Sequence, residues 1–286
     1  MSAQPVTPDL RRWILSQVSE GHGADRILQA MRASGWNDAV ALAAYEHTLA
    51  ESSAAAHKAA GVGAIARSNR VPQAKLVEGA HEVVVNGHHL QILTSLHAPR
   101  VVVFGGLLSH QECDELVGLA QVRLARSETV HLATGASEVN TSRTSEGMFF
   151  ERGENALCAL IEARIAALFN WPVENGEGLQ ILRYRPGAEY KPHYDYFDPA
   201  QPGTAAILKR GGQRVASVVM YLSPPLRGGA TVFPDARLEI NPVKGNAVFF
   251  SYDCAHPSTL TLHGGAPVLA GEKWVATKWL REGRFE

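Results

Sequence analysis

The sequence has few cysteines, no long apolar run and no signal-like start. Its three cysteines, Cys113, Cys158 and Cys254, are odd in number and show no CxxC spacing, which argues against a disulfide framework and against a cysteine zinc site. No apolar segment approaches the roughly 20 residues that a membrane span needs, and the N-terminus lacks the apolar core of a signal peptide. We therefore expect a cytoplasmic protein without a membrane partner.

The sequence also lacks an excess of either charge. It has 27 basic and 28 acidic residues, a formal net charge of −1, so no overall field attracts nucleic acid, and we expect no nucleic-acid partner. A hydrophobic content of 45% and 26 glycines describe an ordinary globular protein that is rich in turns. The 286 residues allow one enzyme-sized domain with a small appendage.

Three segments differ in pattern. Apolar residues recur at three- and four-residue spacing in 1–52, broken twice by glycine-containing turns, which predicts a small N-terminal three-helix unit with Thr7 and Asn37 as N-caps. Small, weakly patterned residues in 53–76 indicate a linker. Residues 77–286 form the main domain. The helical unit is too small for a sizeable core. We interpret it as a packing or dimerisation element, with a weak similarity to ubiquitin-associated-type bundles as the alternative.

The main domain begins with a hairpin and two helices. The hairpin spans 81–93 and turns at Asn86-Gly87, and an apolar strand follows at 101–104. Ser109 with Glu112 has the pattern of a capping box. The helices predicted by the apolar spacing cover 113–124 and 155–169.

After Gly178 the pattern changes to β-strands. Valine and aromatic alternation with short Pro/Gly punctuation is typical of a sandwich or barrel. The sequence therefore predicts an α+β fold with a double-stranded β-helix (jelly-roll) core braced by helices. The expected strands are 179–184, 188–196, 214–222, 229–233, 238–242, 246–251 and 273–280.

The candidate metal ligands come from the strand-rich half. Side chains at i and i+2 of an extended segment share a face, so His193 and Asp195 present an imidazole and a carboxylate together. Either His256 or His263 could supply a second imidazole. His263 is preferred because Gly264 and Gly265 after it allow close backbone approach. Two histidines and one carboxylate form the facial triad of non-haem iron(II) oxygenases.

Two lysines lie on the final strand with opposite parity. Lys273 opens the strand, ten residues after His263, and Lys278 follows on the other face, so only one of them is expected to point inward. A buried lysine is costly unless an anion pairs with it. We assign the inward position to Lys273, where a bound carboxylate would be that anion, and the exposed position to Lys278.

From about Pro99 onward, the chain resembles the catalytic domain of the prolyl 4-hydroxylases, members of the Fe(II)/2-oxoglutarate-dependent dioxygenases. The matching stretches are 180–184 (QILRY), 190–195 (YKPHYD), 228–234 (GGATVFP), and 263–279, which runs from His263 through Lys273 to Trp279. Several ordered motifs over most of the chain are more specific than a lone HxD. The resemblance implies the cofactors Fe(II), 2-oxoglutarate and O₂, with ascorbate as a further family requirement.

The resemblance also implies roles for individual residues. His193, Asp195 and His263 become the iron ligands, so it favours His263 over His256. Lys273 becomes the partner of the distal 2-oxoglutarate carboxylate, and Tyr184 and Thr231 become further co-substrate contacts. Arg143, beside the peptide-binding groove, and Trp279 become the candidate catalytic residues, with a plain core role as the alternative for Trp279.

The implied activity is hydroxylation of a prolyl residue in a proline-containing peptide or protein. The alternatives are a hydroxylase of a free amino acid or other small molecule, a non-catalytic cupin-like metal-binding module, and a zinc hydrolase with the same three ligands. The segments 128–142 and 198–213 are polar and rich in glycine or proline, so both are candidate lids over a substrate.

Overall fold

The computed structural model describes residues 6–19, 24–45, 47–49, 71–74, 76–77, 79–126, 129–130, 137–138 and 144–286. The chain divides into two compact units, Met1–Ser68 and Asn69–Glu286. This division lies inside the predicted linker, and the finer boundaries at 52 and 76 stay predictions. Within the described residues, no helix has both the length and the apolar character needed to cross a membrane.

The smaller unit is helical. It contains α1 (Pro8–Ser19), α2 (Ala24–Ala33) and further helical residues at 38–45 and 47–49. Thr7 Oγ1 accepts a hydrogen bond from Leu10 N at 3.2 Å and Asn37 Oδ1 accepts one from Ala39 N at 3.0 Å, so both predicted caps are in place. The buried apolar residues are Ile14, Ile27, Met31, Ala41 and Ala44.

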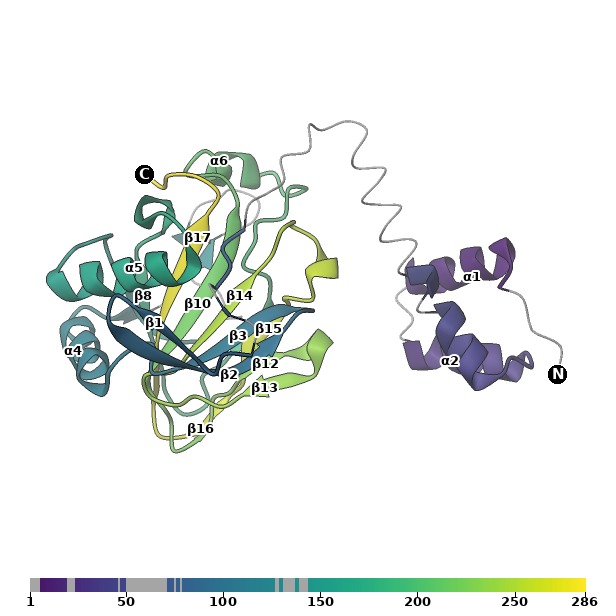
Figure 1. The fold of residues 1–286 in the computed structure, drawn as a ribbon, viewed down its shortest axis with the longest axis horizontal. Coiled ribbons are helices and arrows are strands. Elements are labelled where there is room, and N and C mark those ends of the chain that lie inside the picture. Colours follow the sequence, from purple (N-terminus) through teal and green to yellow (C-terminus); the bar gives the residue numbers. More distant parts are fainter. Residues whose placement is uncertain are drawn as a thin grey trace. The chain divides into compact units, whose positions relative to one another are not determined.

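The larger unit is built on a nine-stranded antiparallel sheet (Figure 1). The hairpin between its first two strands turns at Asn86 and Gly87, whose φ angles of 52° and 78° are those of a type I′ turn, as predicted. In spatial order, the strands are β1 (Glu82–Val85), β2 (His88–Leu96), β3 (Arg100–Gly105), β14 (Ala247–Ser251), β10 (Arg214–Ser223), β17 (Lys273–Arg281), β8 (Leu179–Tyr184), β7 (Glu146–Phe150) and β4 (Ala125–Arg126).

A four-stranded sheet faces this large sheet. Side chains from both sheets form one buried cluster, with Val103, Val248 and Val275 from the large sheet against Phe233 and Ile240 from the small one. The α+β prediction with a jelly-roll core is confirmed. The small sheet has the order β13 (Leu238–Ile240), β12 (Thr231–Phe233), β15 (His263–Gly265), β9 (Tyr190–His193); two-stranded ribbons pair β11 (Arg227–Gly228) with β16 (Val268–Ala270) and β5 (Thr129–Val130) with β6 (Ser137–Glu138).

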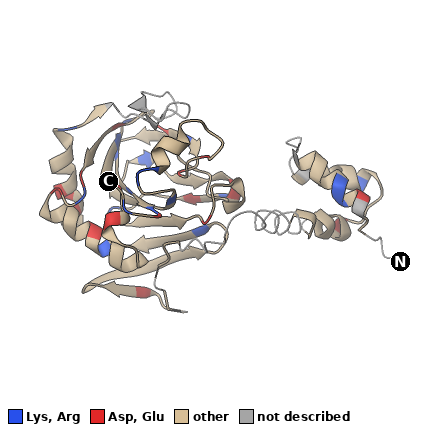
Figure 2. Ribbon diagram, turned by 90° about the horizontal axis from the view of Figure 1, so that it is seen from above, with Lys and Arg blue, Asp and Glu red and all other residues tan. Residues whose placement is uncertain are grey.

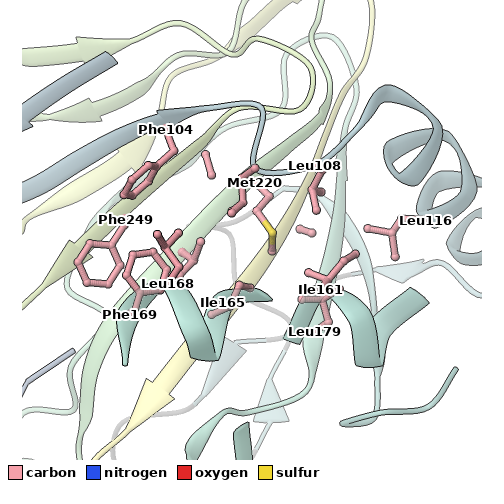
Figure 3. Close-up of a cluster of buried hydrophobic side chains, with 14 of the residues drawn as sticks. Phe104, Leu108, Leu116, Ile161, Ile165, Leu168, Phe169, Leu179, Met220 and Phe249 are labelled. Atoms are coloured by element: carbon pink, nitrogen blue, oxygen red, sulfur yellow. The ribbon is translucent and has the colours of Figure 1, made fainter. Parts of the chain in front are cut away.

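Two helices, α4 (His110–Gln121) and α5 (Ala156–Phe169), cover the other face of the large sheet (Figure 1). Figure 3 shows the cluster between them and the sheet, where Phe169 stacks on Phe249 with ring centroids 4.0 Å apart. On β3, Val102 and Phe104 join this cluster while Val101 and Val103 join the cluster between the sheets. The central strands β3, β14, β10, β17 and β8 are therefore buried on both faces.

The helices begin where their caps place them. Ser109 accepts from Glu112 N at 3.1 Å, and the Glu112 carboxylate accepts from Ser109 N at 2.7 Å, which completes the predicted capping box. Because Ser109 is the cap, α4 begins at His110, three residues before the predicted start at Cys113. Asn155 caps α5 through Cys158 N.

The assignment of Lys278 to an exposed position is wrong. Its side chain is 1% exposed and forms an ion pair with Glu162 of α5. Strand parity correctly places Lys273 and Lys278 on opposite faces, but α5 covers the second face. A lysine there needs a buried carboxylate partner, and Glu162 is that partner.

Several segments differ in detail from the predicted strands and loops. The strand predicted over 188–196 forms ladder pairs only as β9, and the segment 198–213 contains the short helix α6 (Thr204–Leu208). Three 3₁₀ turns complete the described structure: η1 (Val173–Asn175), η2 (Pro234–Ala236) and η3 (Pro257–Thr259). Charged residues of both signs are interspersed over the larger unit (Figure 2).

Candidate active site

The candidate site is a cavity between the two sheets. Because strand side chains alternate between faces, every second residue of β8 and β17 points into it. The lining residues on these strands are Gln180, Leu182 and Tyr184 from β8, and Lys273, Val275, Thr277 and Trp279 from β17. Both strands are central strands of the large sheet and are buried on both faces, so their side chains project from a rigid support.

Two histidines and an aspartate meet at one end of this cavity. β9 and β15 are antiparallel neighbours, and their register places His193 directly opposite His263. Asp195 lies in a bend just beyond the end of β9. One possible ligand atom from each residue lies within 4.8 Å of the other two. Nε2 of His193 is 3.5 Å from Asp195 Oδ1, and Nε2 of His263 is 3.5 Å from Asp195 Oδ2.

Backbone carbonyls orient both imidazoles. Nδ1 of His193 lies 2.9 Å from the carbonyl oxygen of Lys191, and Nδ1 of His263 lies 3.0 Å from that of Thr261. A carbonyl can only accept, so each Nδ1 carries the proton and donates. In the neutral imidazole, each Nε2 then has its lone pair directed toward the aspartate, as a metal ligand requires.

The electrostatics favour the metal-binding protonation states. Burial by itself raises the pKa of Asp195, but the nearby His263 and His193 outweigh it and hold the pKa well below its usual range. Burial lowers the pKa of His263 to about 4, although Asp195 opposes this. At neutral pH the carboxylate is ionised and His263 is neutral. This donor set fits Fe(II) and leaves half of an octahedral ion for other ligands.

Lys273 places a buried positive charge in the same cavity. Its side chain is 4% exposed, and burial lowers its pKa to about 8. Nζ lies 5.5 Å from the ring centroid of Tyr184 and 5.7 Å from that of Tyr221. Within the described part of the chain, no carboxylate forms an ion pair with this ammonium group. The site therefore suits an anionic ligand that supplies the missing partner.

Three more of the predicted site residues line this cavity. Tyr184 is the register partner of Lys273 on the neighbouring strand. Thr231 is buried, and its Oγ1 accepts a hydrogen bond from the hydroxyl of Tyr221 at 2.7 Å. The Trp279 ring lies under the guanidinium of Arg214, with the ring centroid 3.9 Å from the guanidinium carbon. Trp279 Nε1 is buried and has no hydrogen-bond partner among the described residues.

Two sequence-predicted candidates do not join the site in the described structure. Arg143, and most of the predicted loop 128–142, lie outside the described residues. His256 is exposed; its Nδ1 accepts from Ser258 N at 3.1 Å and thereby caps η3. The ring of His256 is thus engaged away from Asp195, and the geometry agrees with the preference for His263.

Sequence reasoning missed several residues of the site. Gln180 and Thr277 share strand parity with Tyr184 and Lys273, so strict alternation would have identified both. Tyr190 stacks on His193, with ring centroids 3.7 Å apart and planes at 22°. Ser217 of β10 donates a hydrogen bond to Asp195 in the bend after β9, a contact that no sequence pattern signals.

Gly264 shows why the two short strands carry the histidines. A Cβ atom at this position would lie 2.8 Å from the carbonyl oxygen of Tyr190, closer than real Cβ contacts allow. Glycine therefore permits β15 to approach β9 and brings His263 beside His193.

Comparison with known proteins agrees with this geometry. The 2OG-Fe(II) oxygenase superfamily matches residues 179–281, which include all three candidate metal ligands and Lys273. Prolyl 4-hydroxylase 1 of Arabidopsis thaliana is 41% identical over 203 residues, 65% of this chain and 70% of the relative. Prolyl 4-hydroxylase 2 of the same plant is 38% identical over 211 residues, 66% of this chain and 69% of the relative.

A solved structure with detectable likeness is a viral collagen prolyl hydroxylase from Paramecium bursaria Chlorella virus-1 in complex with 2OG. It is 32% identical, covers 63% of this chain and 95% of its own, and has a TM-score of 0.48. The curated relatives establish the family by themselves, because each exceeds a third identity over most of its length. The chain belongs to the prolyl 4-hydroxylase family of the 2OG-Fe(II) oxygenase superfamily.

Proposed function

We propose that this chain hydroxylates prolyl residues of a peptide or protein, using Fe(II), 2-oxoglutarate and O₂. The observation that carries the proposal is the buried Lys273 ammonium, which faces the cavity that also holds His193, Asp195 and His263. A bare metal-binding module has no use for such a cation. A dicarboxylate that binds a metal at one end and Lys273 at the other makes use of both.

The chain's own residues bind, orient and exclude water. Lys273 pairs with the distal carboxylate of 2-oxoglutarate, and Tyr184 and Thr231 line the same part of the wall. His193, Asp195 and His263 would hold the iron. Bound iron with 2-oxoglutarate and O₂ supplies the oxidising chemistry: one oxygen atom becomes the substrate hydroxyl and the other enters succinate, with loss of CO₂.

The substrate side is inferred from the relatives and the cavity wall. Relatives named prolyl 4-hydroxylases match over about two thirds of this chain. A proline-rich segment has a preformed extended conformation and loses little entropy on binding. The Trp279 N–H is proposed to donate to a substrate carbonyl, and Arg143 with the loop 128–142 is proposed to border the peptide. An ascorbate requirement, a cytoplasmic location and closure of the loops stay predictions.

The test is mass spectrometry of proline-containing peptides incubated with the protein, Fe(II), 2-oxoglutarate and O₂. We expect a gain of about 16 Da, one oxygen atom, with matching succinate release. His193→Ala abolishes both, because it removes an iron ligand. His256→Ala is the matched control and retains both, because His256 only caps η3. Turnover by His193→Ala at the rate of the His256→Ala variant would overturn the assigned iron site.

The same experiment separates the other candidates. Succinate release stimulated by free proline or another small molecule, and not by peptides, would identify a small-molecule hydroxylase. Metal and 2-oxoglutarate binding without succinate release under any condition would indicate a module without turnover. Hydrolysis that depends on zinc would indicate a hydrolase.

A further inference from the structure

Behind the Asp195 carboxylate lies a pair of buried hydroxyl groups. Ser217 is on β10 and is 0% exposed, and Tyr252 follows β14 directly and is 2% exposed. Ser217 Oγ lies 2.6 Å from Asp195 Oδ2, and the Tyr252 hydroxyl lies 3.2 Å from Ser217 Oγ. The three groups form one hydrogen-bonded chain that leads from the core to the candidate iron site.

The chemistry of the three groups determines which one donates and which one accepts in each hydrogen bond. An ionised carboxylate can only accept hydrogen bonds, so the Ser217 hydroxyl donates to Asp195. Because its only hydroxyl hydrogen is donated to Asp195, Ser217 Oγ accepts a hydrogen bond from the Tyr252 hydroxyl. Burial raises the pKa of Tyr252 well above its usual value, so this phenol stays protonated and donates. The order is therefore Tyr252 to Ser217 to Asp195.

Asp195 needs such support more than the two histidines do. Both imidazoles stand on paired strands, and each Nδ1 is held by a carbonyl two residues earlier in the chain. Asp195 lies past the last residue of β9, in a bend that no strand ladder holds. Its backbone carbonyl accepts a long hydrogen bond of 3.4 Å from Arg214, and its carboxylate is held by Ser217.

The two carboxylate oxygens are consequently different. Each oxygen lies 3.5 Å from an imidazole nitrogen, Oδ1 from Nε2 of His193 and Oδ2 from Nε2 of His263. Oδ2 also accepts the Ser217 hydrogen bond, whereas Oδ1 has no hydroxyl partner among the described residues. We propose that Ser217, supported by Tyr252, is a positioning residue that fixes the Asp195 carboxylate so that Oδ1 binds the metal and Oδ2 does not. This inference rests on the proposed iron site.

Binding through one carboxylate oxygen determines how many coordination positions of the metal stay free. A carboxylate that binds through one oxygen uses one coordination position and leaves three for 2-oxoglutarate and O₂. If both oxygens bound, one of these positions would be lost. A buried serine on a neighbouring strand thus contributes to the reaction without touching the substrate or the metal.

The test measures metal affinity, a property that a merely structural role would not move. Mn(II) binding to the full chain is followed by calorimetry and by electron paramagnetic resonance. We expect Ser217→Ala to weaken Mn(II) binding about 10- to 100-fold, the usual range for loss of a group that orients a ligand. Ser217→Thr restores the hydroxyl and the affinity. Ser251→Ala removes a buried serine from the adjacent strand β14 and leaves the affinity unchanged.

A double variant tests whether Tyr252 acts on Asp195 through Ser217. Tyr252→Phe alone should weaken Mn(II) binding less than Ser217→Ala, because the serine bond remains. In the Ser217→Ala background Tyr252→Phe should add nothing, since Tyr252 acts through Ser217. Additive losses, or Ser217→Ala binding Mn(II) within twofold of the parent chain, would overturn the inference.

These outcomes are separable from failure of the proposed function. If the parent chain binds Mn(II) and the variants follow the expected order while no peptide is hydroxylated, the inference stands and the substrate assignment fails. If hydroxylation is confirmed and the variants bind Mn(II) equally, the inference alone fails. A parent chain that binds no divalent metal would overturn both.

Discussion

Replacement of Lys273 by methionine separates the binding role of this lysine from a structural one. Methionine keeps an unbranched apolar stem in the cavity wall and removes only the charge. The matched control is Lys278→Met on the same strand. Lys278 is also buried but faces α5, where Glu162 pairs with it.

The first expected effect of Lys273→Met is on stability without ligand. Burial lowers the pKa of Lys273 from 10.5 to about 8, and this difference corresponds to about 3 kcal/mol. The folded pKa lies below the unfolded one, so the protonated lysine destabilises the fold fully below pH 8, and this penalty disappears as the pH rises toward 10.5. At pH 7 the variant should therefore gain up to about 3 kcal/mol in unfolding free energy.

The second expected effect has the opposite sign. With 2-oxoglutarate bound, the ammonium has a carboxylate partner, and truncation of one member of a buried charge pair costs about 2–5 kcal/mol. The affinity of Lys273→Met for 2-oxoglutarate should therefore fall by about 30-fold or more. Lys278→Met should bind 2-oxoglutarate as the parent chain does.

Two assays measure the two expected effects of Lys273→Met. Urea unfolding at pH 7 and pH 10 reports the stability, and calorimetry of 2-oxoglutarate with Mn(II) in place of iron reports the affinity. The reasoning would be refuted if Lys273→Met lost stability at pH 7 and kept its affinity for 2-oxoglutarate, because the lysine would then be a structural residue.

The remaining predictions concern the support of the site. Lys278→Met should lose about 3–5 kcal/mol of unfolding free energy, because it leaves the Glu162 carboxylate buried without its partner. A second change in that variant, Glu162→Met, should recover most of the loss. Urea unfolding of the single and the double variant measures both effects. Gly178→Ala should lose at least about 1–3 kcal/mol, since a Cβ there would lie 2.4 Å from the carbonyl oxygen of Phe150. Its control, Gly118→Ala in α4, has open space and should gain up to about 1 kcal/mol; equal midpoints for the two alanine variants would contradict this prediction.

Local features of the fold followed from local physics. Asn86 and Gly87 form the hairpin turn because these residues tolerate positive φ, and Ser109 with Glu112 caps α4 because their side chains reach the free backbone groups next to them. Each depends on residues at most three positions apart, so tertiary context has little chance to override it.

The two final-strand lysines mark the limit of this reasoning. Alternation along the strand placed Lys273 and Lys278 on opposite faces, and the structure agrees. Alternation cannot say what covers a face. Only the packing of α5, more than a hundred residues earlier in the chain, places Glu162 beside Lys278 and makes that position a buried ion pair.

The metal site was likewise predicted only in part from the sequence. The HxD spacing identified His193 and Asp195, but the predicted reason, a shared strand face, holds only for part of the segment because β9 ends at His193. What brings Asp195 to the histidines is a bend held by Arg214 and Ser217 of β10. Those partners come from a strand about twenty residues later, which no spacing rule connects to the motif.

The amino-acid sequence by itself determined the helix caps, the hairpin, the strand-rich half and, through resemblance, the identities of the candidate iron ligands and of Lys273. Only the tertiary structure decided that both faces of the central strands of the large sheet are covered, that His193 lies opposite His263, and that Ser217 and Tyr252 lie behind Asp195. The physical reason is the separation along the sequence of the residues that make each contact. Turns and caps are contacts between near neighbours, whereas burial and the partner of each buried polar group depend on which distant segments the fold brings together.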